Sequence, residues 1–211
     1  PAWRVHAIST CWNSHRHTRG ETMLREQVDL GFDAVELGHG IRISLVEGIR
    51  KFVERSGISI SSLHNFCPLP VEVMGASPNC YEFTSHRESD RRRAVKLTKR
   101  TIDFANQLGA PNVVLHLGRV PMPDFTARLV AMAENGGYLG RRYVRLKLRA
   151  VQLREKRANL YLERALAALA ELADYAAERN VHLGIESREA YEELPSEREM
   201  PRIIEAAESP F

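Results

Sequence analysis

The chain has 211 residues, of which 44% are hydrophobic and 27% are charged. This composition is typical of a globular domain with its own core, and it excludes a fibrous or intrinsically disordered chain. The net charge of +3 is too small an excess to imply nucleic acid or an anionic membrane as a partner. No apolar run approaches the roughly 20 residues that cross a bilayer. The three cysteines have no metal-type spacing, and we expect reduced thiols in a cytoplasmic protein.

Short β-type runs alternate with longer helical runs along the chain. In order, we expect a strand at residues 4–9, a helix at 21–30, a strand at 34–37, a helix at 45–55 and a strand at 58–63. A long polar loop then leads to a helix at 91–108, a strand at 113–117, a helical stretch at about 142–179, a strand at 181–185 and a helix at 197–207. Glycine just after a helix, as at Gly31, Gly57 and Gly109, is an expected stop signal.

This alternation predicts parallel strands joined by crossover helices, in either a closed barrel or an open doubly wound sheet. The loop at residues 10–15 lacks a Gly-x-Gly-x-x-Gly phosphate turn, and the strands end in polar residues that could share one site. Both observations favour an α/β TIM-type (β/α)₈ barrel. A complete barrel takes about 250 residues. We therefore expect only about the first five β/α units in this chain, as a single domain over residues 1–211 that is incomplete at its C-terminal end.

The polar residues at the strand ends can be assigned to one face, because alternate residues of a strand share a face. His64 has the parity of Ile58 and Ile60, and His116 has that of Val114. Glu36 and Glu186 end the second and fifth strands in the same way. If these side chains point inward, Glu36, His64, His116 and Glu186 meet at the carboxyl ends of the strands. Two imidazoles and two carboxylates are a plausible ligand set for Zn²⁺, Mn²⁺ or a similar ion.

Each of these residues also has a structural alternative. Glu186 ends an apolar strand, where an unpaired carboxylate is costly, so a cation or an arginine must compensate it. Arg188, two residues later, could do so as a simple salt bridge or could bind an anionic group of a substrate. Trp12, in the first strand–helix loop, could stack on a sugar ring or merely pack within the loop.

Four segments resemble the xylose isomerase-like TIM barrels, a superfamily of sugar and sugar-phosphate isomerases and epimerases that includes the AP endonuclease family 2 enzymes. The segments are GFDAVEL at 31–37, SSLHN at 61–65, GAPNVVLHLG at 109–118 and LGIESR at 183–188. They resemble the second to fifth strand segments of that superfamily, in the right order, and the resemblance covers essentially the whole chain.

The resemblance implies a divalent metal cofactor, Mn²⁺, Zn²⁺, Mg²⁺ or Co²⁺. It implies Glu186 as a metal ligand and as one member of the catalytic acid–base pair. His64 and His116 match positions that bind additional zinc in the endonuclease branch and line the substrate pocket in the isomerase branch. We predict Glu36, His64, His116, Arg188 and Trp12 as substrate-binding residues, and Glu186, His116 and His64 as the metal site. The remaining ligands of the family lie on its sixth to eighth strands.

The leading hypothesis is a metal-dependent isomerase, of the ketose epimerase or aldose–ketose type, that moves a proton next to a carbonyl. The first alternative is a zinc-dependent AP endonuclease-like phosphodiesterase, for which the basic stretch at 141–157 could follow a phosphate backbone. Helical spacing of the basic residues and the low net charge count against nucleic acid. The second alternative is a non-catalytic truncated barrel. We expect a small sugar as partner and no membrane partner, and homo-oligomer formation stays open.

Overall fold

The computed structural model describes residues 5–207. Its main sheet holds five parallel strands in the order β1-β2-β3-β4-β6. These strands are β1 (Ala7–Ser9), β2 (Ala34–Leu37), β3 (Ser59–His64), β4 (Asn112–Leu115) and β6 (His182–Ile185). Each pairs with the next of the five along the chain, as consecutive units of a β/α barrel do. The predicted fold class is confirmed, although Arg4, the first residue of the predicted first strand, lies outside the described residues.

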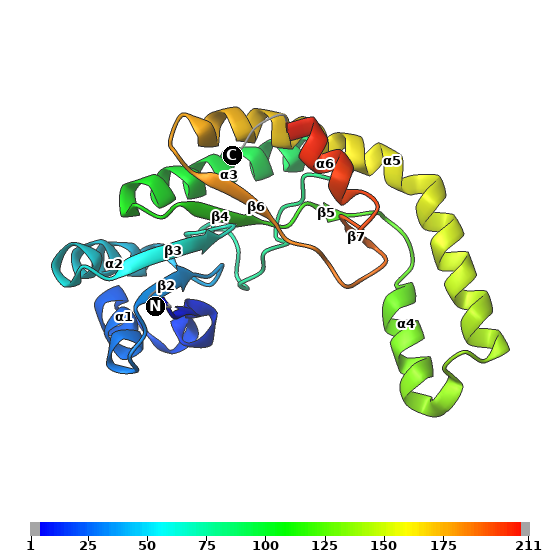
Figure 1. The fold of residues 1–211 in the computed structure, drawn as a ribbon, viewed down its shortest axis with the longest axis horizontal. Helices are drawn as coiled ribbons and strands as arrows, with labels where there is room; N and C mark the ends of the chain where they lie inside the picture. Colours follow the sequence, from blue (N-terminus) through cyan, green and yellow to red (C-terminus); the bar gives the residue numbers. More distant parts are fainter. Residues whose placement is uncertain (1–4, 208–211) are drawn as a thin grey trace.

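The principal helices connect these strands and pack beside the sheet (Figure 1). They are α1 (Gly20–Asp29), α2 (Ile43–Ser56), α3 (Glu88–Leu108) and α5 (Arg141–Ala177), and α6 (Met200–Ala207) follows the last strand of the sheet. The short helical turns η1 (Thr10–Trp12) and η2 (Ser14–Arg16) fill the first loop. Gly57 and Gly109 end α2 and α3 with φ of +67° and +66°, a conformation that glycine adopts without steric cost. None of the described helices is both long and apolar enough to span a membrane.

The two faces of the sheet differ in burial, as the alternation of the strands predicts. Leu37, Leu63 and Leu115 are fully buried in the core that the helices cover. The alternate positions Glu36 and His64 are only partly buried and belong to the opposite face. An irregularity in the β2–β3 pairing aligns Val35 with Ile60 but Glu36 with Ser62. The sheet therefore carries polar groups along the face that its helices leave open.

A helical arm, which we define as residues 125–157, projects from the body of the molecule (Figure 1). It consists of α4 (Phe125–Met132), the turn η3 (Ala133–Gly137) and the N-terminal part of α5. No helix is expected at α4 from the sequence pattern. At the root of the arm, the buried Glu192 carboxylate accepts hydrogen bonds from Phe125 N at 2.7 Å and Thr126 N at 3.1 Å. Thr126 Oγ1 also donates to it at 2.7 Å. This carboxylate therefore caps the start of α4 together with the N-cap residue Asp124, whose Oδ1 accepts from Ala127 N at 2.8 Å.

A second, two-stranded antiparallel sheet links the loops that follow β4 and β6. It pairs β5 (Gly118–Arg119) with β7 (Glu193–Leu194). Arg154 of α5 holds the same region, because its guanidinium donates to Glu199 carboxylate oxygens at 2.7 and 2.9 Å. It also donates to the carbonyls of Tyr191 at 2.7 Å and Glu193 at 2.9 Å. Neither strand was predicted, because a two-residue strand is too short to show an alternation of polar and apolar residues.

Candidate metal centre

Three potential metal ligands meet at the carboxyl ends of three strands. Glu186 Oε2 lies 3.1 Å from His64 Nε2 and 3.0 Å from His116 Nε2. The ligand atoms of the three residues all lie within 4.8 Å of one another, and this is the one group of three or more such residues within residues 5–207. His64 ends β3, while His116 and Glu186 directly follow β4 and β6. The structure thus brings together the three residues that the sequence analysis predicted as ligands.

The other ring nitrogen of each histidine faces a hydrogen-bond acceptor. His64 Nδ1 lies 3.1 Å from the Asn65 carbonyl oxygen, and His116 Nδ1 lies 2.9 Å from Asn79 Oδ1. An Nδ1–H on each ring satisfies these acceptors, so a neutral ring turns its bare Nε2 toward Glu186. Three acceptor atoms that face one another repel unless a proton or a metal cation lies between them. Second groups that orient a histidine in this way are characteristic of metal sites.

Arg188 supplies positive charge on one side of this group. Its Nη1 lies 2.8 Å from Glu186 Oε1 and 3.1 Å from His116 Nε2, and its Nη2 lies 3.3 Å from Glu193 Oε1. Arg188 Nε is buried and has no hydrogen-bond partner in the described structure. The salt bridge between Arg188 and Glu186, one of the two roles expected of this arginine, is therefore present. It leaves Oε2 of Glu186, the oxygen nearer the histidines, free of the arginine.

The pKa values of the centre follow from burial and from these neighbours. Burial, assisted by the charge of Arg188, lowers the pKa of His116 below 6.5 and keeps its imidazole neutral. Burial alone would raise the pKa of Glu186, but hydrogen bonds from His116 and His64 outweigh it when their Nε2 atoms carry the protons that a metal would replace, and that pKa then lies below 4.5. An ionised carboxylate beside a neutral imidazole is the protonation state that metal binding requires.

Two other predicted site residues lie elsewhere. Glu36 accepts a hydrogen bond from Ser62 Oγ at 3.0 Å and does not belong to the group of three. Trp12 is 44% exposed, and the guanidinium of Arg16 lies 4.3 Å from the centre of its ring. Trp12 lines a hollow with residues of α1, whereas no residue of the candidate centre lines that hollow. The substrate-binding roles of Glu36 and Trp12 stay predictions.

Two residues that sequence reasoning missed adjoin the centre. Asn79 orients His116, as described above. The ring of His39 lies edge-on to that of His64, with 5.3 Å between the ring centres. Burial lowers the pKa of His39 below 6.5, although the carboxylates of Glu36 and Glu186 act in the opposite direction. His39 follows β2 in a Gly-His-Gly segment, so the strand-end rule could have found it. Asn79 lies in a long loop, where no pattern distinguishes it.

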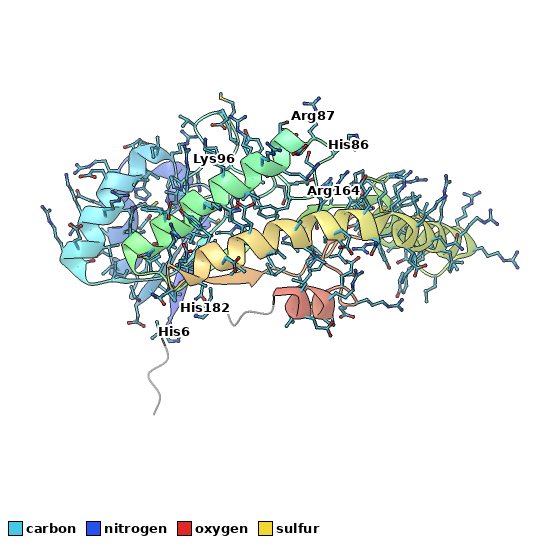
Figure 2. All side chains as sticks on the ribbon, turned by 90° about the horizontal axis from the view of Figure 1, so that it is seen from above. His6, His86, Arg87, Lys96, Arg164 and His182 are labelled. Atoms are coloured by element: carbon cyan, nitrogen blue, oxygen red, sulfur yellow. The ribbon has the colours of Figure 1, made fainter. Side chains whose placement is uncertain are left out.

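Two hollows flank the centre, and a larger one lies apart from it. Arg188, Tyr191 and Glu193 line a pocket of about 450 Å³. His39 and Cys11 line another, of about 190 Å³. The largest hollow, about 760 Å³, lies between α3 and α5, where Figure 2 shows Lys96 and Arg164. None of its lining residues belongs to the candidate centre, so its size does not make it the functional site.

One curated relative matches part of the chain. An uncharacterised protein of Sinorhizobium fredii, y4fM, is 37% identical to the chain over 93 residues. That match covers 40% of this chain and 29% of the relative, so it extends over only a part of either protein.

Solved structures with the same fold include sugar epimerases. An L-ribulose 3-epimerase matches 97% of this chain with a TM-score of 0.62 at 17% identity. A D-psicose 3-epimerase, determined in the presence of D-fructose, matches 98% with a TM-score of 0.60 at 14% identity. A putative xylose isomerase of Rhodospirillum rubrum matches 95% with a TM-score of 0.63 at 17% identity. The matches span only 57%, 61% and 60% of those three chains, and at these identities they show the fold alone.

A family model described as "Xylose isomerase-like TIM barrel" matches residues 24–211. The matched region contains four of the five strands of the main sheet and all three residues of the candidate centre. The chain therefore belongs to the xylose isomerase-like TIM barrel family.

Proposed function

We propose that this chain carries the His64–His116–Glu186 part of the metal centre of a sugar isomerase, of the ketose epimerase or aldose–ketose type. The observation that carries the proposal is the convergence of three acceptor atoms within 4.8 Å, two of them on histidines oriented by Nδ1 contacts. We also propose that residues 1–211 form a single domain of the family. The epimerases named above support the reaction class, and the activity of the whole protein is part of this proposal.

The donor set fits a divalent metal of the Zn²⁺ or Mn²⁺ type, because imidazole and carboxylate are ligands that these ions share. His64 and His116 would hold the ion through Nε2, and Glu186 through Oε2. When bound, the ion would polarise the substrate carbonyl and stabilise negative charge on its oxygen. Asn65 and Asn79 would keep both rings in the tautomer that offers Nε2.

Glu186 is the group that would move the proton on the carbon next to the carbonyl. Its carboxyl is ionised at neutral pH, so it can accept the proton as a base. Arg188 holds Oε1 of this carboxylate at 2.8 Å and so fixes its orientation. The same guanidinium lines the pocket of about 450 Å³, which lies within the size range of small-molecule sites. Arg188 would therefore position both the base and an oxygen of the sugar.

Solvent exchange tests the reaction. The protein is incubated with Mn²⁺ and D-psicose, D-fructose, D-tagatose or L-ribulose in D₂O, and deuterium at the carbon next to the carbonyl is followed by NMR. Glu186→Gln is expected to slow incorporation by at least about 100-fold, the usual contribution of a catalytic acid–base group. Glu205→Gln, an exposed carboxylate on α6, is the matched control and should exchange at the native rate.

Metal binding is measured separately, by equilibrium dialysis with Zn²⁺ and with Mn²⁺. Retained exchange in Glu186→Gln would overturn its assignment as the base, and unchanged binding in His64→Ala with His116→Ala would overturn the ligand set. The same preparations are tested for nicking of an abasic DNA duplex with an EDTA control. Metal-dependent nicking without sugar exchange would replace the isomerase proposal by the phosphodiesterase.

A further inference from the structure

The charge of the chain is segregated between the arm and the body. Residues 125–157 contain nine basic and two acidic residues, a net charge of +7. The other 178 residues contain 21 basic and 25 acidic residues, a net charge of −4. The low total of +3 therefore averages a strongly basic projection with a mildly acidic body. The absence of a membrane partner was inferred from that average, which does not describe the surface of the arm.

Most of the positive side chains on the arm have no counterion. The side chains of six of them make no ion pair or hydrogen bond with any other residue in the described part of the chain: Arg128, Arg141, Arg142, Arg145, Arg149 and Lys156. All six are exposed. By contrast, Arg154 and Arg157 at the root are held by Glu199 and by the Pro121 carbonyl. Arg154 and Arg157 thus secure the root of the arm and Lys147 contacts Tyr191, whereas the six unpartnered groups are available to an external anion.

Apolar side chains lie among these free cations. Tyr138 and Leu139 at the tip are 62% and 66% exposed, and Leu148 on α5 is 57% exposed. Val130 and Val144 are 50% and 41% exposed. Leu139 has a φ of +60°, an uncommon backbone conformation for leucine, and it is held there with its side chain largely in solvent. Both views show the arm extending beyond the body of the molecule (Figures 1 and 2).

The partner of this surface must accept both positive charge and apolar side chains. A second arm is unsuitable, because two projections of +7 each repel one another. A phosphate backbone of nucleic acid would pair with the arginines but would leave the leucines and valines in water. An anionic lipid surface satisfies both groups, since basic side chains meet the headgroups while apolar ones enter the boundary of the acyl chains.

We propose that residues 125–157 dock on an anionic lipid surface through the tip residues Tyr138 and Leu139 and the flanking arginines. Clusters of four to eight basic residues on an amphipathic helix are typical of such surfaces. The projection of the arm lets its tip reach a plane without contact between that plane and the body. This proposal does not depend on the sugar isomerase proposal, because none of the arm residues belongs to the candidate metal centre.

Sedimentation with vesicles tests the proposal. The full chain is mixed with phosphatidylglycerol–phosphatidylcholine vesicles and with vesicles of phosphatidylcholine alone. Binding is expected only to the anionic vesicles and should fall as salt is raised. Combined Arg141→Glu, Arg145→Glu and Arg149→Glu substitution should weaken binding by about 100-fold or more, at roughly a factor of five for each basic residue. The control variant replaces three exposed arginines of the body, Arg55, Arg87 and Arg198, by glutamate, and it should bind as the native chain does.

Two further measurements separate lipid from other partners. Leu139→Ser with Leu148→Ser keeps the charge of the arm and should weaken vesicle binding while leaving the far-UV spectrum unchanged. Equal binding of both charge variants to anionic vesicles would overturn the proposal. So would tighter, salt-sensitive binding to single-stranded or duplex DNA than to vesicles, or a dimer in light scattering that the arm substitutions dissociate.

Discussion

Asn79 Oδ1 lies 2.9 Å from Nδ1 of His116, and this contact fixes which nitrogen of that imidazole faces Glu186. Replacing the acceptor by an apolar group of similar size, Asn79→Leu, leaves the buried Nδ1–H without a partner and releases the ring to the other tautomer. We expect Zn²⁺ affinity to fall by about 10–100-fold, as it does when other orienting groups are lost. Asn79→Asp retains an acceptor and should retain most of the affinity. Competition against a chromophoric chelator measures both variants, and native affinity in Asn79→Leu would contradict the orienting role.

The Arg154–Glu199 pair should make stability sensitive to acid. Burial works against the charge of Glu199, but hydrogen bonds from Arg154 and from the backbone of Ser196 outweigh it, so its folded pKa lies below the ordinary 4.5. A depressed carboxyl pKa contributes stability that is complete above the unfolded pKa and is lost as pH falls through the folded one. We therefore expect the loss to occur below pH 4.5.

Glu199→Gln should remove this component of the acid dependence. It should also destabilise the fold near neutral pH by about 1–3 kcal/mol, because the partly buried Arg154 loses its charged partner but keeps the Tyr191 and Glu193 carbonyls. Urea unfolding at several pH values from about 7 to about 3 measures both effects. An unchanged slope of unfolding free energy against pH in this variant would show that Glu199 does not titrate as described.

The packing of α1 against α2 leaves no room for a side chain at Gly20. A Cβ there would lie 2.2 Å from the Leu45 carbonyl oxygen and 2.5 Å from Ile49 N. Both are backbone atoms that cannot rotate away. Gly20→Ala should therefore cost about 1–3 kcal/mol of stability or more. Gly75→Ala, where a Cβ meets nothing within 4 Å, is the control and should change stability by less than about 0.5 kcal/mol. Equal melting temperatures for the two variants would contradict this account.

Loss of the carboxylate at position 192 should loosen α4. Glu192→Ala removes the acceptor for Phe125 N and Thr126 N, which are then left unsatisfied at a cost of about 1–3 kcal/mol. We expect faster amide hydrogen exchange at the start of α4 and little change in β2 or β3. Glu189→Ala, an exposed neighbour, serves as the control. Unaltered exchange at Phe125 and Thr126 in Glu192→Ala would exclude the capping role.

The fold and the convergence of the three candidate ligands were predictable, because the parallel order of the strands brings their carboxyl ends to one edge of the sheet. Strand parity placed His116 and Glu186 on one face, and the parallel arrangement then required that they share one end of the sheet with His64. The parity of His64 with Ile60 does not hold, because the irregular β2–β3 register aligns the buried Ile60 with Val35 but Ser62 with Glu36. The same rule placed Glu36 correctly on that face, but it could not show that the Glu36 carboxylate would accept a hydrogen bond from Ser62 Oγ. Parity states which way a side chain points and not which neighbour it contacts.

The arm was missed although Asp124 is a local N-cap of α4, whose Oδ1 accepts from Ala127 N. What the sequence could not show is the second acceptor at this helix start, because Glu192 lies more than 60 residues later. The β5–β7 pair consists of two residues on each side, and only the surrounding fold brings them together. The role of Asn79 depends likewise on a contact 37 residues away, within a loop that has no periodicity.

Glu192 and Glu193 are neighbours in the chain, yet they serve different partners. The first caps the helix that begins the arm, and the second lies 3.3 Å from the guanidinium that holds Glu186. Adjacent residues thus contact the first residue of the arm, Phe125, and the arginine that pairs with the proposed catalytic base, Glu186. The base of the arm and the support of Glu186 therefore share an anchoring segment of two residues, although no arm residue belongs to the candidate centre.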